Sequence, residues 1–388
     1  MKFEKSIIRR YLLSALHAIL LTWLCYVAGN IPYSFGSEKQ TIKWFNAITG
    51  WLSGKTYTVP DEILPINVTY DKQLVDVADE YGIPMGVIDI TDRSKLHSLL
   101  HKIDSVGNYR YVVCDILFSP EYKTPADSAL FGLISRMRNI VIAGGNDISR
   151  LSESLHSKAF RSSYNTTIED GDFVKYPLIT EDEESLPLHM WRELSGSTIK
   201  GNSIFCHSEG KMCRRSVFLN FPVRISEFYS DGQGRQWLNL GTDILQVEQM
   251  LDFESMFRDK IILIGSYVED DIHSTIVGDM PGIMINYNAF HALVNGKHCV
   301  NYIALLILFI IYYLVTLFAF EKYEFVDKLQ HRAFAKSPVV KIVLSWVSLS
   351  TIFTIIFFIL YFIFKEVYDI FFIATYFTLL RTIRNLKS

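Results

Sequence analysis

Four long apolar runs constrain the fold of this 388-residue chain more than any other feature. The first covers 11–29, and the other three cover 301–320, 339–364 and 367–381. About 20 consecutive apolar residues are enough for a helix to cross the hydrocarbon core of a bilayer. We therefore predict four α-helical transmembrane spans, with one aqueous domain at 30–300 between the first and the second. The fourth run is short and crosses the bilayer only if its first residues lie in the membrane interface.

A cleaved secretory signal peptide is the alternative interpretation of the first run. This run is longer than a usual signal core, and the segment 29–33 at its end contains no small-x-small cleavage site. Both features favour an uncleaved membrane anchor.

Basic residues near the ends of the runs predict their orientation, because cytoplasmic loops are enriched in Lys and Arg. Such residues cluster in the amino terminus (1–10), in the loop 321–338 and in the tail (382–388), whereas the link between the third and fourth runs has only Lys365. We expect these three segments in the cytoplasm and the large domain outside it. The prediction is a multi-pass protein of the inner (cytoplasmic) membrane of a bacterial cell, with its domain on the periplasmic or extracellular side.

Within the aqueous domain, short apolar strands alternate with helical patterns, which is typical of βαβ units in a parallel sheet. Strands are predicted over 84–90, 109–118 and 139–145, and Thr91 or Asp92 is a candidate cap for the helix that follows the first. The run 261–264 is apolar at every position, as expected for a central strand covered on both faces. The predicted class is an α/β domain with a mainly parallel sheet. Its strand-core positions are Val87, Val112, Ile140 and Ile261. Residues 30–60 show no clear period and are expected to pack under the domain, with a position on the membrane surface as the alternative.

Acidic residues lie in or after several of these strands. Asp89 and Asp115 belong to two predicted strands, and Asp270, Asp271 and His273 follow the strand at 261–264. Because ligands bind an open parallel sheet at the carboxyl ends of its strands, we expect these side chains to converge if the strands are neighbours. The cluster is a candidate site for a polar ligand or a divalent cation, which prefers carboxylate oxygens. The alternative is that each Asp bonds its own turn or is solvated.

Cys206 and Cys213 flank a six-residue segment with the composition of a hairpin turn. In an oxidising compartment such a pair predicts a disulfide. Zinc binding by the pair together with His207 is the alternative, although the spacing matches no common zinc finger. Cys299 is left at the membrane surface, either free or in an intermolecular bridge.

Several function classes lack their motifs. A net charge of −3 leaves no basic footprint for nucleic acid. The sequence has no Gly-x-Ser-x-Gly elbow, and the glycines at 144–145 lack the Lys-Ser/Thr of a phosphate-binding loop. The apolar runs carry too few ionisable residues for a transporter. We therefore expect no catalytic residues, and no cofactor besides the possible divalent cation.

Several short segments occur in an order and at a spacing that resemble those of a known domain family. They are VVCDILF at 112–118, Asp127 at a helix start, NIVIA at 139–143, GKMCR at 210–214, WLN at 237–239, and FRDKIILIG at 257–265, followed by Pro281-Gly282 and Asn288-Ala289. With one span before them and three after, they resemble the second type of CHASE domain, an extracellular sensing domain of cyclases and sensor kinases. The resemblance covers roughly 40–300.

Three departures from the family pattern affect what the resemblance implies. The middle turn is HSEG at 207–210 where the family usually has Asp-x-Asp-Gly, and the closing loop has several acidic residues before Thr275 where the family usually has one. We also expect a stand-alone sensing domain, without the kinase, cyclase or phosphodiesterase domain that a family member with its own output carries after the last run. The resemblance implies a membrane-anchored sensor that detects a ligand or partner outside the cytoplasm and signals in trans to a separate effector.

The expected partners are the membrane and a separate signalling or envelope protein, with a homo-oligomer left open. The alternative function is a non-enzymatic structural accessory subunit of a membrane complex. A metal-dependent enzyme built on the acidic loop is a third interpretation.

Overall fold

The computed structural model describes residues 2–34, 36–53, 60–78, 81, 83–145, 148–162, 172–225, 236–268, 270–321, 338–368 and 373–380. The chain forms two compact units. The helical unit comprises Met1–Gly54, Thr198–Phe218 and Gly296–Ser388, and the sheet domain comprises Lys55–Ser197 and Leu219–Asn295. The predicted cytoplasmic tail at 382–388 lies outside the described residues, as does the predicted loop at 321–338 apart from its two end residues.

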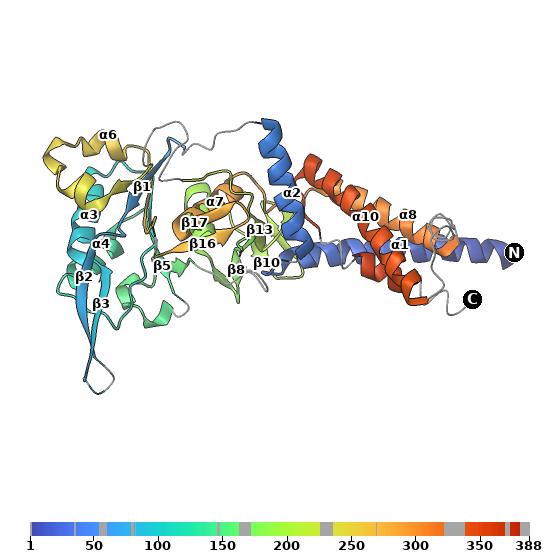
Figure 1. Cartoon of the computed structure of the whole chain (residues 1–388), viewed down its shortest axis with the longest axis horizontal. Helices are drawn as coiled ribbons and strands as arrows, with labels where there is room; N and C mark the ends of the chain where they lie inside the picture. Colours follow the sequence, from blue (N-terminus) through green and yellow to red (C-terminus); the bar gives the residue numbers. More distant parts are fainter. Residues whose placement is uncertain are drawn as a thin grey trace. The chain divides into compact units, whose positions relative to one another are not determined.

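A six-stranded parallel sheet forms the centre of the sheet domain (Figure 1). Its order is β14 (Leu238–Asn239), β1 (Ile63–Asn67), β15 (Ile261–Gly265), β4 (Tyr111–Cys114), β5 (Ile140–Gly144) and β6 (Ala159–Arg161). All neighbouring pairs are parallel. Every residue of β15 is buried, as its uninterrupted apolar sequence predicts. The predicted α/β fold with a mainly parallel sheet is confirmed.

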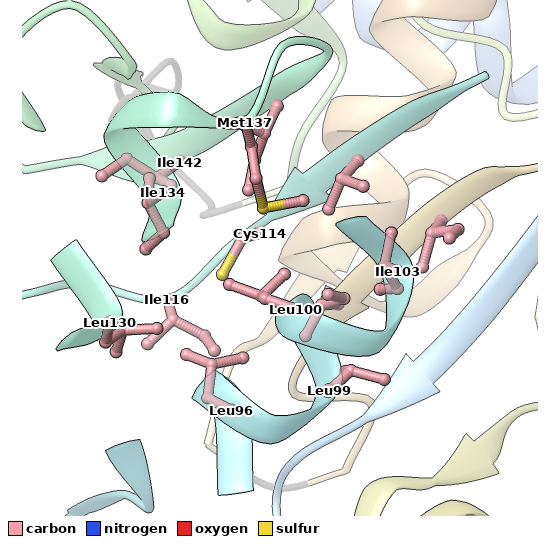
Figure 2. Packing of buried hydrophobic residues seen from close by; sticks show 14 of the residues in the cluster. Leu96, Leu99, Leu100, Ile103, Cys114, Ile116, Leu130, Ile134, Met137 and Ile142 are labelled. Atoms are coloured by element: carbon pink, nitrogen blue, oxygen red, sulfur yellow. The ribbon is translucent and has the colours of Figure 1, made fainter. Parts of the chain in front are cut away.

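Helices cover both faces of this sheet. On one face, α3 (Arg93–Val106) and α4 (Asp127–Arg136) pack their apolar stripes against alternate strand residues (Figure 2). Elsewhere on the sheet, α5 (Leu186–Ser195) packs against β5 and β6, and α7 (Gly282–Val294) packs against β15 and α5. The cluster under α3 and α4 includes Leu96, Leu99, Leu100, Ile103, Cys114, Ile116, Leu130, Ile134, Met137 and Ile142.

The start of α3 follows the sequence prediction. The Asp92 side chain accepts hydrogen bonds from the backbone N–H groups of Ser94 (2.9 Å) and Lys95 (3.0 Å), which are otherwise unpaired donors of the first turn. Gly107 ends the helix in the left-handed conformation, with φ of 67°. The cap makes Arg93 the first helical residue.

The predicted sheet strand at 84–90 is a correction. This segment is β3 (Pro84–Thr91), which pairs antiparallel with β2 (Lys72–Ala78) in a separate two-stranded ribbon that projects from the sheet domain (Figure 1). Val87 is 63% exposed and is therefore not a core position. The segment contains the polar residues Asp89 and Thr91 and has Gly86 at positive φ, which suits a solvated ribbon better than a strand covered on both faces.

Short elements complete the sheet domain and its connections. They are η1 (Ile148–Arg150), η2 (Glu153–Leu155), β7 (Lys175–Pro177), β8 (Ile179–Thr180), β9 (Glu183–Glu184), η3 (Leu240–Leu245), η4 (Glu248–Met250), α6 (Phe253–Phe257), β16 (Ile272–Thr275) and β17 (Gly278–Pro281). Of these, β16 and β17 pair as an antiparallel hairpin directly before α7. Strand β13 (Ser216–Phe218) belongs to the helical unit.

The helical unit contains α1 (Lys2–Asn30), α2 (Gly36–Ser53), α8 (Tyr302–Glu321) and α10 (Pro338–Phe364), and residues 373–380 are also helical. A buried cluster joins four of these helices through Leu21, Leu308, Tyr312, Phe353 and Phe377. The helix α2 is a correction to the aperiodic segment predicted at 30–60. It buries Ile42 and Phe45 but exposes Trp44, and this mixture weakens the helical period in the sequence.

Among the residues that the structure describes, one helix, Ile8–Asn30, is long and apolar enough to cross a membrane. The apolar stretches Tyr302–Leu317 and Ser350–Phe364 are shorter. One membrane anchor is thus consistent with the structure, and the other three spans stay predictions.

A tight hairpin in the helical unit carries the predicted cysteine pair. Strands β11 (Cys206–Ser208) and β12 (Lys211–Cys213) are joined by Glu209 and Gly210, both at positive φ, and β10 (Lys200–Gly201) pairs with β11. The two Sγ atoms lie 3.5 Å apart and both cysteines are free thiols here, so the disulfide stays a prediction. The Tyr26 hydroxyl donates to the Cys213 carbonyl oxygen (3.0 Å) and accepts from the Cys206 N–H (3.0 Å), which ties α1 to the hairpin.

A buried ion pair fastens this hairpin to the ends of two helices. Arg214 follows β12, Glu366 follows α10, and their Nη1 and Oε2 atoms are 2.6 Å apart, with side chains 4% and 5% exposed. The other Glu366 oxygen accepts the backbone N–H of Asn301 (2.9 Å), just before α8. Each charge therefore depends on the other for compensation.

We expect Glu366→Gln to lower the free energy of unfolding by about 3–5 kcal/mol, because the Arg214 guanidinium would remain buried without its counter-charge. Denaturant unfolding of the full chain in detergent measures this loss. The matched control is Glu254→Gln, which breaks the exposed pair between Glu254 of α6 and Arg258 directly after it, and is expected to cost no more than about 0.5 kcal/mol. An equal loss of unfolding free energy in the two variants would show that the buried pair stabilises the protein no more than the exposed pair does.

Candidate ligand-binding site

A cavity of about 520 Å³ lies at the carboxyl edge of the parallel sheet. Its walls include Val68 and Thr69 after β1, Ser266 after β15, and Asp115 after β4. Because every strand of this sheet runs in the same direction, the strands end at one edge, which is where open α/β sheets bind their ligands. The β2–β3 ribbon, the start of α3, the β16–β17 segment and the start of α7 complete the walls.

Asp115 is the first residue beyond β4, which ends earlier than the predicted strand 109–118. Its Oδ2 accepts a hydrogen bond from Nδ2 of Asn286 (2.9 Å), and the Tyr176 hydroxyl donates to Oδ1 of the same Asn286 (2.6 Å). These two hydrogen bonds fix the orientation of the Asn286 side-chain amide. Burial, and next the charge of Asp271, raise the pKa of Asp115 to about 7, although the bonds from Asn286 and Ser162 favour the ionised form.

Asp271 and His273 form a pair on the same wall. His273 Nε2 lies 2.8 Å from Asp271 Oδ1, and this hydrogen bond raises the pKa of His273 against the opposing effect of its partial burial. A Cβ atom at Gly282 would overlap with Asp271 Oδ2, so the carboxylate occupies the space beside the first residue of α7. The partial positive charge of a helix amino terminus favours a carboxylate in this position.

The β2–β3 ribbon contributes the remaining charged groups. Lys72 forms an ion pair with Asp270 that is partly open to solvent, and Asp89 lies exposed on the cavity wall. Asp71, just before β2, is buried, and its oxygens bind Lys95 Nζ (2.7 Å) and the Gly241 N–H (3.0 Å). These bonds hold the base of the ribbon to α3 and to the segment after β14.

All five predicted site residues line this one cavity: Asp89, Asp115, Asp270, Asp271 and His273. Asp115, Asp270, Asp271 and His273 reach it by the expected route, from the ends of parallel strands. Asp89 reaches it from the ribbon, and its placement at the end of a sheet strand was wrong. The ligand-binding role of the five residues stays a prediction.

The described side chains do not form a recognisable metal-binding cluster. Within the described ranges, no group of three or more His, Cys, Asp or Glu side chains is placed to hold one. A divalent cation in this cavity, or zinc at the cysteine hairpin, therefore stays a prediction that no cluster supports.

Sequence reasoning missed three residues of the site. Arg93 lines the cavity from the first turn of α3, and Asn286 orients Asp115 from α7. Asn67 joins strand ends: its Oδ1 accepts the N–H groups of Thr69 and Tyr267 (both 3.1 Å), and its Nδ2 donates to Asn239 Oδ1 (2.9 Å). A polar residue at the end of an apolar strand was the available signal for Asn67, since a buried amide needs partners.

The raised pKa of Asp115 predicts a pH-dependent stability. In the unfolded chain an Asp ionises near pH 3.9. Because the folded protein holds this proton to about pH 7, ionisation costs stability as the pH rises between those values. Relative to Asp115→Asn, the wild-type protein should lose roughly 2–4 kcal/mol of unfolding free energy between pH 4 and pH 7.5.

Chemical denaturation across this pH range measures the difference. Asp279→Asn, an exposed carboxyl in β17 outside the cavity wall, is the control and should follow the wild-type profile. Parallel curves for wild type and Asp115→Asn would contradict the raised pKa.

Comparison with known proteins identifies the domain. The chain matches the CHASE2 domain family over residues 45–319, which is more than two thirds of its length and includes the whole parallel sheet. Neither the curated proteins nor the solved structures include a match. The family match confirms the resemblance inferred from the sequence motifs. CHASE2 domains are extracellular sensing domains. The chain belongs to the CHASE2 domain family.

Proposed function

We propose that this protein is a membrane-anchored extracytoplasmic sensor, which takes a small polar ligand into the cavity at the sheet edge and signals to a separate effector. The observation that carries the proposal is the cavity itself, because five chargeable side chains from three segments of the chain line one half-open cavity of about 520 Å³. That volume lies within the range of small-molecule sites. Membership of a family of sensing domains supports the same function.

The construction of the walls favours a response to binding. The ribbon, the β16–β17 segment and α7 each contribute one wall, and a ligand that contacts several of them favours the arrangement in which they are close. Helix α7 begins at the cavity and ends at Val294, and the chain enters α8 at Tyr302. The segment after the cavity therefore leads along the chain to the membrane helices.

The placement outside the cytoplasm rests on the first helix and on charge. Helix α1 is the anchor, and its basic amino-terminal residues favour a cytoplasmic start. The proposal includes four spans in the inner membrane of a bacterial cell. The proposal also includes transfer of the signal to a second protein, which contacts the sensor through the membrane helices.

Ligand binding in the cavity is testable without knowing the ligand. A panel of soluble metabolites is screened against the full chain in detergent by thermal unfolding, and at least one compound should raise the unfolding temperature. Asp271→Asn should weaken that compound about 10-fold or more by removing a charged wall group. Asp279→Asn, from the same hairpin region, should bind as wild type does. Equal loss in both variants, or none in either, would contradict binding at this wall.

Signalling in trans is tested by crosslinking and mass spectrometry on the protein in its native membrane. Recovery of a kinase, a cyclase or a transcription regulator is the expected result, because the sensor needs an effector. Recovery of envelope or transport components alone would contradict signalling and would favour a structural accessory subunit instead.

A further inference from the structure

A buried arginine on the cavity wall lacks the partners that such a group requires. Arg93 lines the cavity and is 2% exposed. Its guanidinium donates no hydrogen bond to any residue that the structure describes, and its Nε and Nη1 atoms are buried without a partner. The nearest carboxylate, Asp127, lies 3.9 Å from Nε, beyond hydrogen-bonding distance, and the ring of Phe118 lies 4.4 Å from Cζ.

Arg93 also contradicts the local preference of its helix. It is the first residue of α3, where the partial positive charge of the helix amino terminus disfavours a cation. Burial lowers its pKa, and Asp127 only partly opposes this effect. Burial of an underbonded cation against the helix dipole is costly, and such local conflicts are expected where a site serves function. A planar anion such as a carboxylate supplies the two acceptors that the guanidinium lacks.

The cavity also has acidic groups on segments other than that of Arg93. Arg93 packs beside Phe118 and Asp127 of the α4 side, whereas Asp115, after β4, bonds Asn286 of α7. Two of the other wall carboxylates are already compensated, Asp270 by Lys72 and Asp271 by His273. Asp115 and the exposed Asp89 therefore remain as acceptors for a positively charged group.

We infer that the ligand is a small zwitterion of the α-amino acid class, held by its carboxylate on Arg93 and by its ammonium group on the Asp115 side of the cavity. This inference rests on the proposed sensor function and adds the ligand class. The volume of about 520 Å³ leaves room for a side chain besides the two charged groups.

The test is isothermal titration of the full chain in detergent with three sets of probes. The first set is the free L-α-amino acids, the second is the corresponding decarboxylated amines, and the third is the corresponding carboxylic acids without the amino group. At least one amino acid should bind, and its amine and its acid should each bind about 10-fold more weakly or worse, since each lacks one charge-assisted contact.

Two substitutions assign the carboxylate contact. Arg93→Met keeps the length of the side chain without its charge, and it should abolish the preference for the amino acid over its amine. Arg93→Lys keeps the charge without the fork of donors and should recover part of that preference. Arg258→Met removes an exposed arginine directly after α6 and should leave binding unchanged. The unfolding temperature of each variant verifies that it is folded, and Arg93→Met is expected to unfold no earlier than wild type because it removes an underbonded charge.

The outcomes separate this inference from the sensor proposal. Binding of the acids or the amines as tightly as the amino acids would overturn the zwitterion class, as would an unchanged preference in folded Arg93→Met. If no amino acid binds but another metabolite raises the unfolding temperature through Asp271, the ligand class is wrong and the sensor proposal stands. If nothing binds in either experiment, both are wrong.

Discussion

The insertion of β15 between β1 and β4 is the interaction on which both the fold and the cavity depend. Its register sets Ile264 beside Ile66 on one side and beside Cys114 on the other, so three strands end together. The same pairing carries the loop after β15, with Asp271 and His273, to the residue that follows β4, Asp115. In this way one buried apolar strand brings together polar groups that are far apart in the sequence, because parallel strands place their carboxyl ends at a common edge.

Much of this arrangement was visible in local patterns. The apolar run at 261–264 and the Asp92 cap each predicted a single element with a defined physical reason, and both are confirmed. The strand order was not predictable, since a strand that is apolar on both faces carries no alternation to specify its neighbours or register. Val87 was misassigned for a related reason: β-branched residues suit a solvated ribbon as well as a sheet.

The candidate site also contains residues that the sequence predicted and residues, such as Arg93, that it did not. Acidic residues after strands are a simple signal, and Asp115, Asp270, Asp271 and His273 all line the cavity. Arg93 gave no such signal, because its position directly after a helix cap is one that any solvated residue occupies. Its burial arises from the packing of α3 and α4 over the strand ends, a tertiary effect that the sequence of α3 does not contain. The positive charge of Arg93 was therefore the feature of the cavity that local sequence patterns were least able to predict.

The β2–β3 ribbon is the wall best suited to move. A two-stranded ribbon has little stability of its own, and this one is fastened at its base by Asp71 and across the cavity by the Lys72–Asp270 pair. The Asp71 contacts are buried and should persist, whereas the partly exposed pair contributes little and is easily exchanged for water. A ligand between the ribbon and the sheet edge thus competes with a weak tether rather than with a packed core. Under the proposed sensor function, the energy of ligand binding would select one ribbon position.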